Sequence, residues 1–131
     1  MKTIILGVMV AAMVMTTFAG ESLKFTQLQL ANSPLVTFRV IVRSGAINDP
    51  KGKEGLTALT ASLIAEGGTK DLTYAQVVDK LYPWAARMDV QTDQEITTFI
   101  GAVHRDHLGE FYRLFADLLL HPRFDPSDFQ R

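Results

Sequence analysis

Apolar and polar residues alternate in several stretches of the chain, which is the period of a half-buried β-strand. The alternation covers residues 24–30 and 35–42, and the turn-forming residues Asn32-Ser33-Pro34 lie between these two stretches. It returns at 88–92, and 96–103 is then rich in β-branched and aromatic residues. The pattern therefore predicts two early strands and a later hairpin.

Three other segments have apolar residues at the spacing of one helical face. They span Gly55 to Glu66, 73–82 and 108–119, and the second opens with Thr73 and Gln76 in the form of a capping box. The third has the strongest stripe, which consists of Leu108, Phe111, Tyr112, Phe115, Leu118 and Leu119. We predict a helix over each segment.

The end of the chain has the residues of a helix start. In Asp125-Pro126-Ser127-Asp128 a capping carboxylate precedes a proline in the first turn, yet the sequence stops at Arg131. We therefore expect the last element to be cut short. The order β-β-α-α-β-β-α predicts an α+β fold, with helices packed on a mixed, mainly antiparallel sheet that is incomplete.

Composition limits the function further. The chain has 13 basic and 14 acidic residues and a formal net charge of −1, so it lacks the basic surplus that is typical of nucleic-acid binding. It has no cysteine, which excludes disulfides, a lipid-modified cysteine and thiolate catalysis.

The N-terminal segment has the pattern of a secretory signal. Lys2 supplies a positive start, residues 4–15 are apolar, and the small residues of Thr17-Phe18-Ala19 suit a cleavage site. The apolar run is shorter than the roughly 20 residues that a membrane span needs. We predict a signal peptide over 1–20, a single incomplete domain over 21–131, no permanent membrane span, and export to the periplasm or the extracellular space.

The order and spacing of several segments resemble the pitrilysin-insulinase family of zinc metallopeptidases, the inverzincins. The resemblance is carried by Val40-Ile41-Val42-Arg43-Ser44-Gly45-Ala46, the helix start at 55–63, Gly68-Thr69, Thr73, the hairpin around Asp93, and Leu120-His121-Pro122-Arg123-Phe124. It covers about residues 24–131. It implies the first part of a pitrilysin-like or processing-peptidase-like domain, in a family where two domain pairs close around a substrate peptide.

Active members of this family carry H-x-x-E-H on the helix that begins here at Gly55. Histidines at i and i+4 lie on one helical face and hold one zinc ion, while the glutamate is the general base. The resemblance aligns these positions with Ala58, Ala61 and Ser62. Because methyl and hydroxyl groups are not zinc ligands, we predict a degenerate motif with no catalytic residue and no bound metal.

The resemblance implies a non-catalytic subunit that assists a zinc-bearing sister subunit in binding and cleaving peptides or unfolded polypeptides. Zinc is then expected only in the partner. Two alternatives stay open: a scaffold or binding module with no proteolytic role, and an active metalloendopeptidase with a non-standard site. The three histidines, His104, His107 and His121, offer no clear ligand spacing. We interpret them as surface or helix-end residues, and Trp84 as the edge of the core.

Overall fold

The computed structural model describes Lys24, residues 26–28 and residues 32–130. The chain divides into two units, 1–30 and 31–131, and every helix and strand of the described residues belongs to the second unit. The strands are β1 (Leu35–Val42), β2 (Arg87–Thr92) and β3 (Thr97–His104). The α-helices are α1 (Leu56–Glu66), α2 (Tyr74–Leu81) and α3 (Leu108–Leu120), and short 3₁₀ turns lie at Ala46–Asn48, Tyr82–Trp84, Arg105–His107 and Pro126–Gln130.

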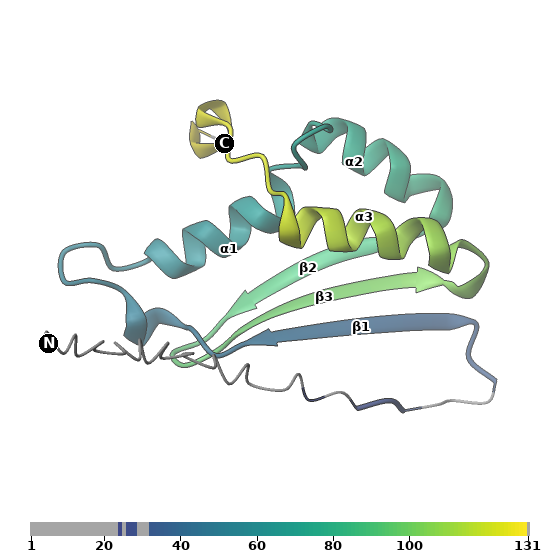
Figure 1. Cartoon of the computed structure of the whole chain (residues 1–131), viewed down its shortest axis with the longest axis horizontal. Helices are drawn as coiled ribbons and strands as arrows, with labels where there is room; N and C mark the ends of the chain where they lie inside the picture. Colours follow the sequence, from purple (N-terminus) through teal and green to yellow (C-terminus); the bar gives the residue numbers. More distant parts are fainter. Residues whose placement is uncertain (1–23, 25, 29–31, 131) are drawn as a thin grey trace, which may run out of the picture. The chain divides into compact units, whose positions relative to one another are not determined.

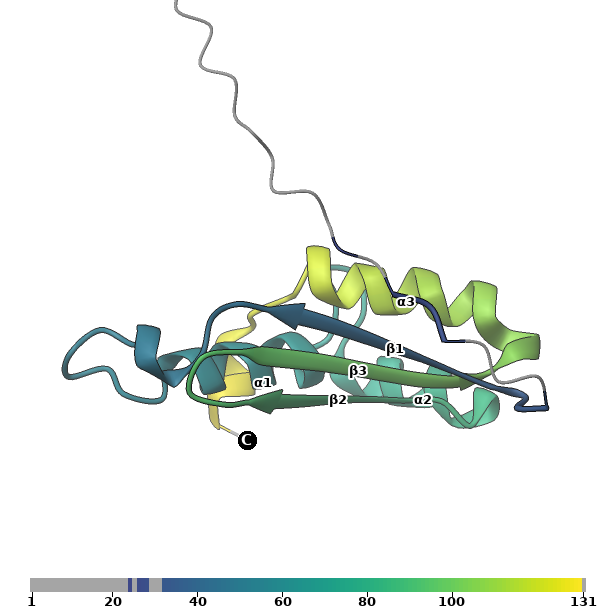
Figure 2. The same cartoon turned by 90° about the horizontal axis from the view of Figure 1, so that it is seen from below.

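The three strands form one antiparallel sheet in which β3 is central (Figure 2). The predicted hairpin pairs β2 with β3, while β1 pairs with the other edge of β3 across a long stretch of sequence. Phe38 of β1 and Met88 of β2 both lie opposite Gly101 of β3. This register places the alternate apolar residues of all three strands on one face.

All three helices cover that face of the sheet (Figure 1). The main core consists of Phe99 and Val103 from β3, Phe111 and Phe115 from α3, and Ala61 from α1. At Gly101, α3 comes very close to the central strand, since an added Cβ would lie 2.8 Å from the rings of Phe111 and Phe115. The fold therefore uses a residue without a side chain to seat α3 on the sheet.

A smaller core lies between α2 and α3 and contains Val77, Leu114 and Leu118. The capping box at the start of α2 is formed as predicted: Gln76 N donates to Thr73 Oγ1 at 3.3 Å, and Thr73 N donates to Gln76 Oε1 at 2.8 Å. These two bonds fix the point at which α2 begins.

The segments after α1 and after α3 lie side by side. Lys70 N donates to the carbonyl of His121 at 2.8 Å, and Arg123 N donates to the carbonyl of Gly68 at 3.2 Å. Between them Thr69 is fully buried, and its hydroxyl accepts from Leu72 N at 3.1 Å. This pairing joins the ends of the two helices.

The α+β architecture is confirmed, but two expected elements differ. Lys24 and residues 26–28 carry no strand, so the first predicted strand is wrong over them, and its remaining residues lie outside the described part. A strand needs a hydrogen-bonding neighbour, and alternation alone does not supply one. The helix expected to begin at residues 125–128 is instead a 3₁₀ turn, Pro126–Gln130. Asp125 caps this turn, as predicted, by accepting a hydrogen bond from Ser127 N.

The predicted signal peptide over 1–20 lies outside the described residues. Within the described part, no helix has both the length and the hydropathy that a membrane crossing demands.

Candidate functional site

The start of α1 is held by a carboxylate from the preceding loop. Asp49 accepts hydrogen bonds from the backbone amides of Gly55 at 2.6 Å and of Thr57 at 2.8 Å. The hydroxyl and amide of Thr57, together with the other amides at this helix end, hold the pKa of Asp49 below its usual range. Asp49 thus satisfies the first amides of the helix that carries the motif positions.

The same loop is fastened to the β2–β3 hairpin. Ala46 N donates to the carbonyl of Asp93 and Ile47 N to that of Gln94, each at 2.9 Å. Gly45 is required here because an added Cβ would lie 2.5 Å from the carbonyl oxygens of Asp93 and Gln94. These contacts fix the loop that leads into α1.

The three predicted motif positions lie on α1 in two different environments. Ala58 and Ser62 are exposed, whereas Ala61 is only 3% exposed and belongs to the main core. Leu56 and Leu59 on the same helix are 43% and 45% exposed, and Ile47 on the loop before it is 71% exposed. The exposed residues of α1 between positions 56 and 62 are therefore small or apolar, and the acidic Glu66 follows them at the end of the helix.

The side chains at the three motif positions are not zinc ligands. Ala58 and Ala61 present methyl groups, and the hydroxyl of Ser62 is not among the side chains that ordinarily hold this ion. Among the described residues, no group of three or more His, Cys, Asp or Glu side chains could hold a metal ion. The assignment of Ala58, Ala61 and Ser62 to the motif stays a prediction from sequence.

Each histidine makes a local contact of its own. His104 Nδ1 is 3.2 Å from Asp106 Oδ2, and His121 Nδ1 is 2.9 Å from Asp117 Oδ1. The His107 ring stacks on Trp84 with the ring centroids 6.3 Å apart. Each contact serves the end of a helix or strand, and the structure does not bring the three imidazoles together.

Trp84 lies at the edge of the core, as predicted, and packs against both clusters. It also lines an open hollow of about 500 Å³ on the helical layer. The other lining residues are Leu72, Lys80, Glu110, Arg113, Leu114 and Asp117. Because the hollow has two basic and two acidic side chains over an apolar floor, its charge does not select for anions or cations.

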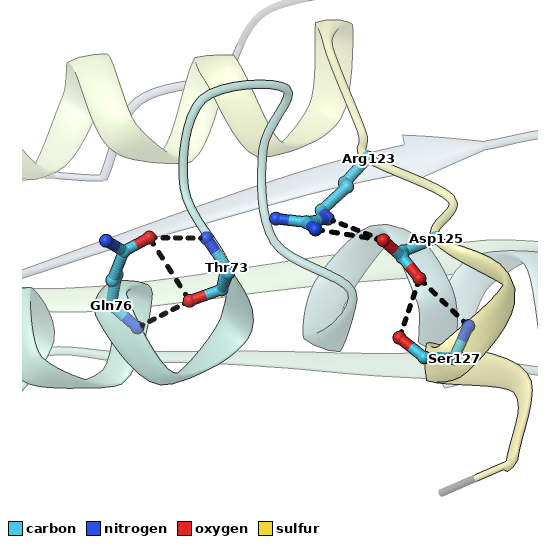
Figure 3. A network of polar contacts seen from close by, with 5 residues as sticks. All are labelled: Thr73, Gln76, Arg123, Asp125 and Ser127. Atoms are coloured by element: carbon cyan, nitrogen blue, oxygen red, sulfur yellow. Dashed lines mark hydrogen bonds and ion pairs between the residues drawn. The ribbon is translucent and has the colours of Figure 1, made fainter.

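A polar network lies beside the start of α2 (Figure 3). Asp125 accepts from the Ser127 hydroxyl at 2.6 Å, from Ser127 N at 2.9 Å and from Arg123 Nη2 at 2.9 Å. These partners, Ser127 first, lower the pKa of Asp125 well below its usual range. Because these hydrogen bonds are made within residues 123–127, the network caps the turn that begins at Pro126.

Two features of the site were missed by the sequence analysis. The capping role of Asp49 was not predicted, although an Asp ahead of a helix start is a known capping signal. The pairing of Gly68 and Lys70 with the residues after α3 has no local signal, because it joins segments about fifty residues apart in sequence.

Comparison with known proteins identifies the family. Residues 26–131 match the family model of insulinase (Peptidase family M16), and the chain belongs to this family. The solved structure of a protease from Helicobacter pylori has the same fold, with a TM-score of 0.65 and 18% sequence identity. The match covers 75% of this chain and 24% of that protease, so the chain spans about a quarter of its length. No curated protein matches the sequence.

Proposed function

We propose that this chain is part of a non-catalytic insulinase-family subunit, which assists a zinc-bearing sister subunit in binding and cleaving peptides or unfolded polypeptides. The proposal rests on one observation: methyl and hydroxyl groups stand at the positions where this family's active members carry two zinc ligands and a general base. Hydrolysis assisted by zinc needs the ion, its bound water and the base together. The partner subunit supplies all three.

The exposed face of α1 supports a role in contacting polypeptide. Leu56 and Leu59 offer apolar surface on the helix that also exposes Ala58 and Ser62, and Ile47 on the preceding loop is exposed as well. Such a surface makes van der Waals contacts with many sequences. Export of the protein, with the signal peptide over 1–20, is a further part of the proposal.

Reconstitution tests this function. The full-length protein is purified alone, and again together with a family member that carries an intact H-x-x-E-H motif and is encoded beside it. We expect stoichiometric zinc only in the sister subunit, and cleavage of a fluorogenic peptide only in the mixture. The control is the same mixture with the sister subunit's motif glutamate changed to glutamine, which should hold zinc and cleave nothing.

The alternatives give different results in the same assay. A stable complex whose peptide turnover equals that of the sister subunit alone would favour a scaffold or binding module. One equivalent of zinc in the protein purified alone, with cleavage that a chelator abolishes, would overturn the proposal in favour of an active enzyme with a non-standard site.

A further inference from the structure

The outer side of α3 carries a row of residues at helical spacing. Gly109, Arg113, Ala116 and Leu120 follow one another at i, i+4, i+7 and i+11, which is one face of the helix. Arg113 is exposed, Ala116 is half-buried, and Leu120 is 72% exposed. A Cβ added at Gly109 would meet no atom within 4 Å outside its own stretch of helix, so open space lies over it. The described part of the chain thus leaves this face of α3 uncovered.

Two opposite charges lie on this side of α3. Glu110 and Arg113 are both exposed and three residues apart, a spacing at which opposite charges often pair. Within the described residues, neither forms an ion pair with another side chain. Asp117, by contrast, is engaged by His121, whose Nδ1 lies 2.9 Å from Asp117 Oδ1. The surface therefore offers one acidic and one basic side chain to a partner.

We propose that this outer face of α3 is the contact between two copies of the chain, with the two helices antiparallel about a two-fold axis near residue 111. Such an axis places Arg113 of each copy beside Glu110 of the other, so the same ion pair is made twice. It also places Tyr112, which is 57% exposed, beside Gly109 of the second copy, where no side chain stands in its way. Helical spacing puts Glu110 and Tyr112 on opposite flanks of the row, so one axis satisfies both contacts.

The charges favour this partner and this register. An axis at Arg113 itself would bring two guanidinium groups together, and like charges across an interface repel. An axis midway between Arg113 and Asp117 would direct the arginine to a carboxylate that His121 already engages. A surface with one charge of each sign matches neither a uniformly anionic nor a uniformly cationic partner, whereas a second copy presents the opposite sign at both points.

Charge reversal in the full-length protein tests the reciprocal ion pair. Arg113→Glu places like charges at both contacts, and so does Glu110→Arg, so we expect each variant alone to raise the Kd of the dimer about tenfold or more. A mixture of the two variants restores opposite charges at both contacts. The mixture should therefore form a heterodimer with a Kd close to that of the parent dimer. Sedimentation velocity at about 1–100 μM protein measures these equilibria.

Arg39→Glu is the matched control. It makes the same change of charge at another exposed residue, on β1 instead of α3, and should leave the Kd of the dimer close to that of the parent. Every variant should also keep a Tm close to that of the parent, because the substituted side chains are exposed. Rescue in the mixture does not depend on this comparison, since damage to the fold of either variant would not be repaired by the other.

Three results would overturn the inference. The first is a parent protein that stays monomeric over this range of concentration, including one that associates only with a sister subunit. The second is a parent dimer whose Kd is unchanged in both variants, and the third is a mixture that stays monomeric. Each would leave the proposed function intact, because that function depends on zinc content and peptide cleavage and not on the association of two identical copies.

Discussion

At the scale of single residues, the fold depends on places where a side chain is absent. Gly101 is buried in the central strand, and an added Cβ would lie 2.8 Å from Phe111 and Phe115. Phe38 stacks on both rings, with centroids 6.1 and 5.8 Å away, so the rings have little freedom to move aside. Gly101 is therefore a point where β1, β3 and α3 are in close contact.

Replacing this glycine should be costly. Gly101→Val should lower the free energy of unfolding by roughly 1–3 kcal/mol, because overpacking displaces the rings of α3. The control is Ala102→Val on the opposite face of the same strand, which should change it by less than about 0.5 kcal/mol. Urea unfolding of both variants measures the difference, and equal losses would show that Gly101 is not a close contact.

At the scale of secondary-structure elements, local patterns predicted the helices and the hairpin well. The stripe of 108–119 became α3, but Tyr112 of that stripe is 57% exposed, while Leu114, which was not assigned to it, is buried. The spacing predicts a helix, whereas the positions of the sheet and of α2 decide which side of that helix is buried. The strand expected at 24–30 shows the same limit, because a strand is defined by its neighbour.

The start of α1 also depends on a contact between elements. Asp49 accepts hydrogen bonds from Gly55 N and Thr57 N, and its pKa is lowered. Because its folded-state pKa is below the unfolded value, this carboxylate stabilises the fold above that value and the contribution is lost as pH falls through the folded pKa.

Asp49→Asn should therefore lower the Tm at pH 7, and its gap to the parent should narrow as pH falls below about 4. Thermal unfolding between pH 7 and about 3 measures the gap. Thr57→Val removes one hydrogen-bond donor to Asp49 and leaves the carboxylate in place. At pH 7 its Tm should therefore differ less from that of the parent than the Tm of Asp49→Asn does. A gap for Asp49→Asn that stays constant over this range would mean that the charge of Asp49 contributes nothing to the cap.

At the scale of the whole molecule, the sequence predicted the fold class and the family, but not which motif positions face solvent. The pairing of β1 with β3 and the burial of Ala61 arise from contacts between distant segments. Helical spacing places positions 58, 61 and 62 on one side of α1, and only the packed domain separates Ala61 from the exposed pair. The absence of zinc ligands at positions 58, 61 and 62 stays a prediction, which depends only on the atoms that each side chain carries.

Thermal unfolding in the presence of a chelator or of zinc tests whether the full-length protein binds a zinc ion. An ion present at one hundred times its Kd for the folded state adds about 2.7 kcal/mol of stability, which raises the Tm of a domain of 150–250 residues by about 5 °C or more. Because Ala58, Ala61 and Ser62 offer no ligand set, we expect the same Tm, within about 1 °C, in excess EDTA and in excess Zn²⁺. The variant with Ala58→His and Ser62→His is the positive control, since its Tm should rise with Zn²⁺ and fall back with EDTA. A comparable shift in the parent would place a zinc site elsewhere in the protein and remove the ground for assigning catalysis to a partner.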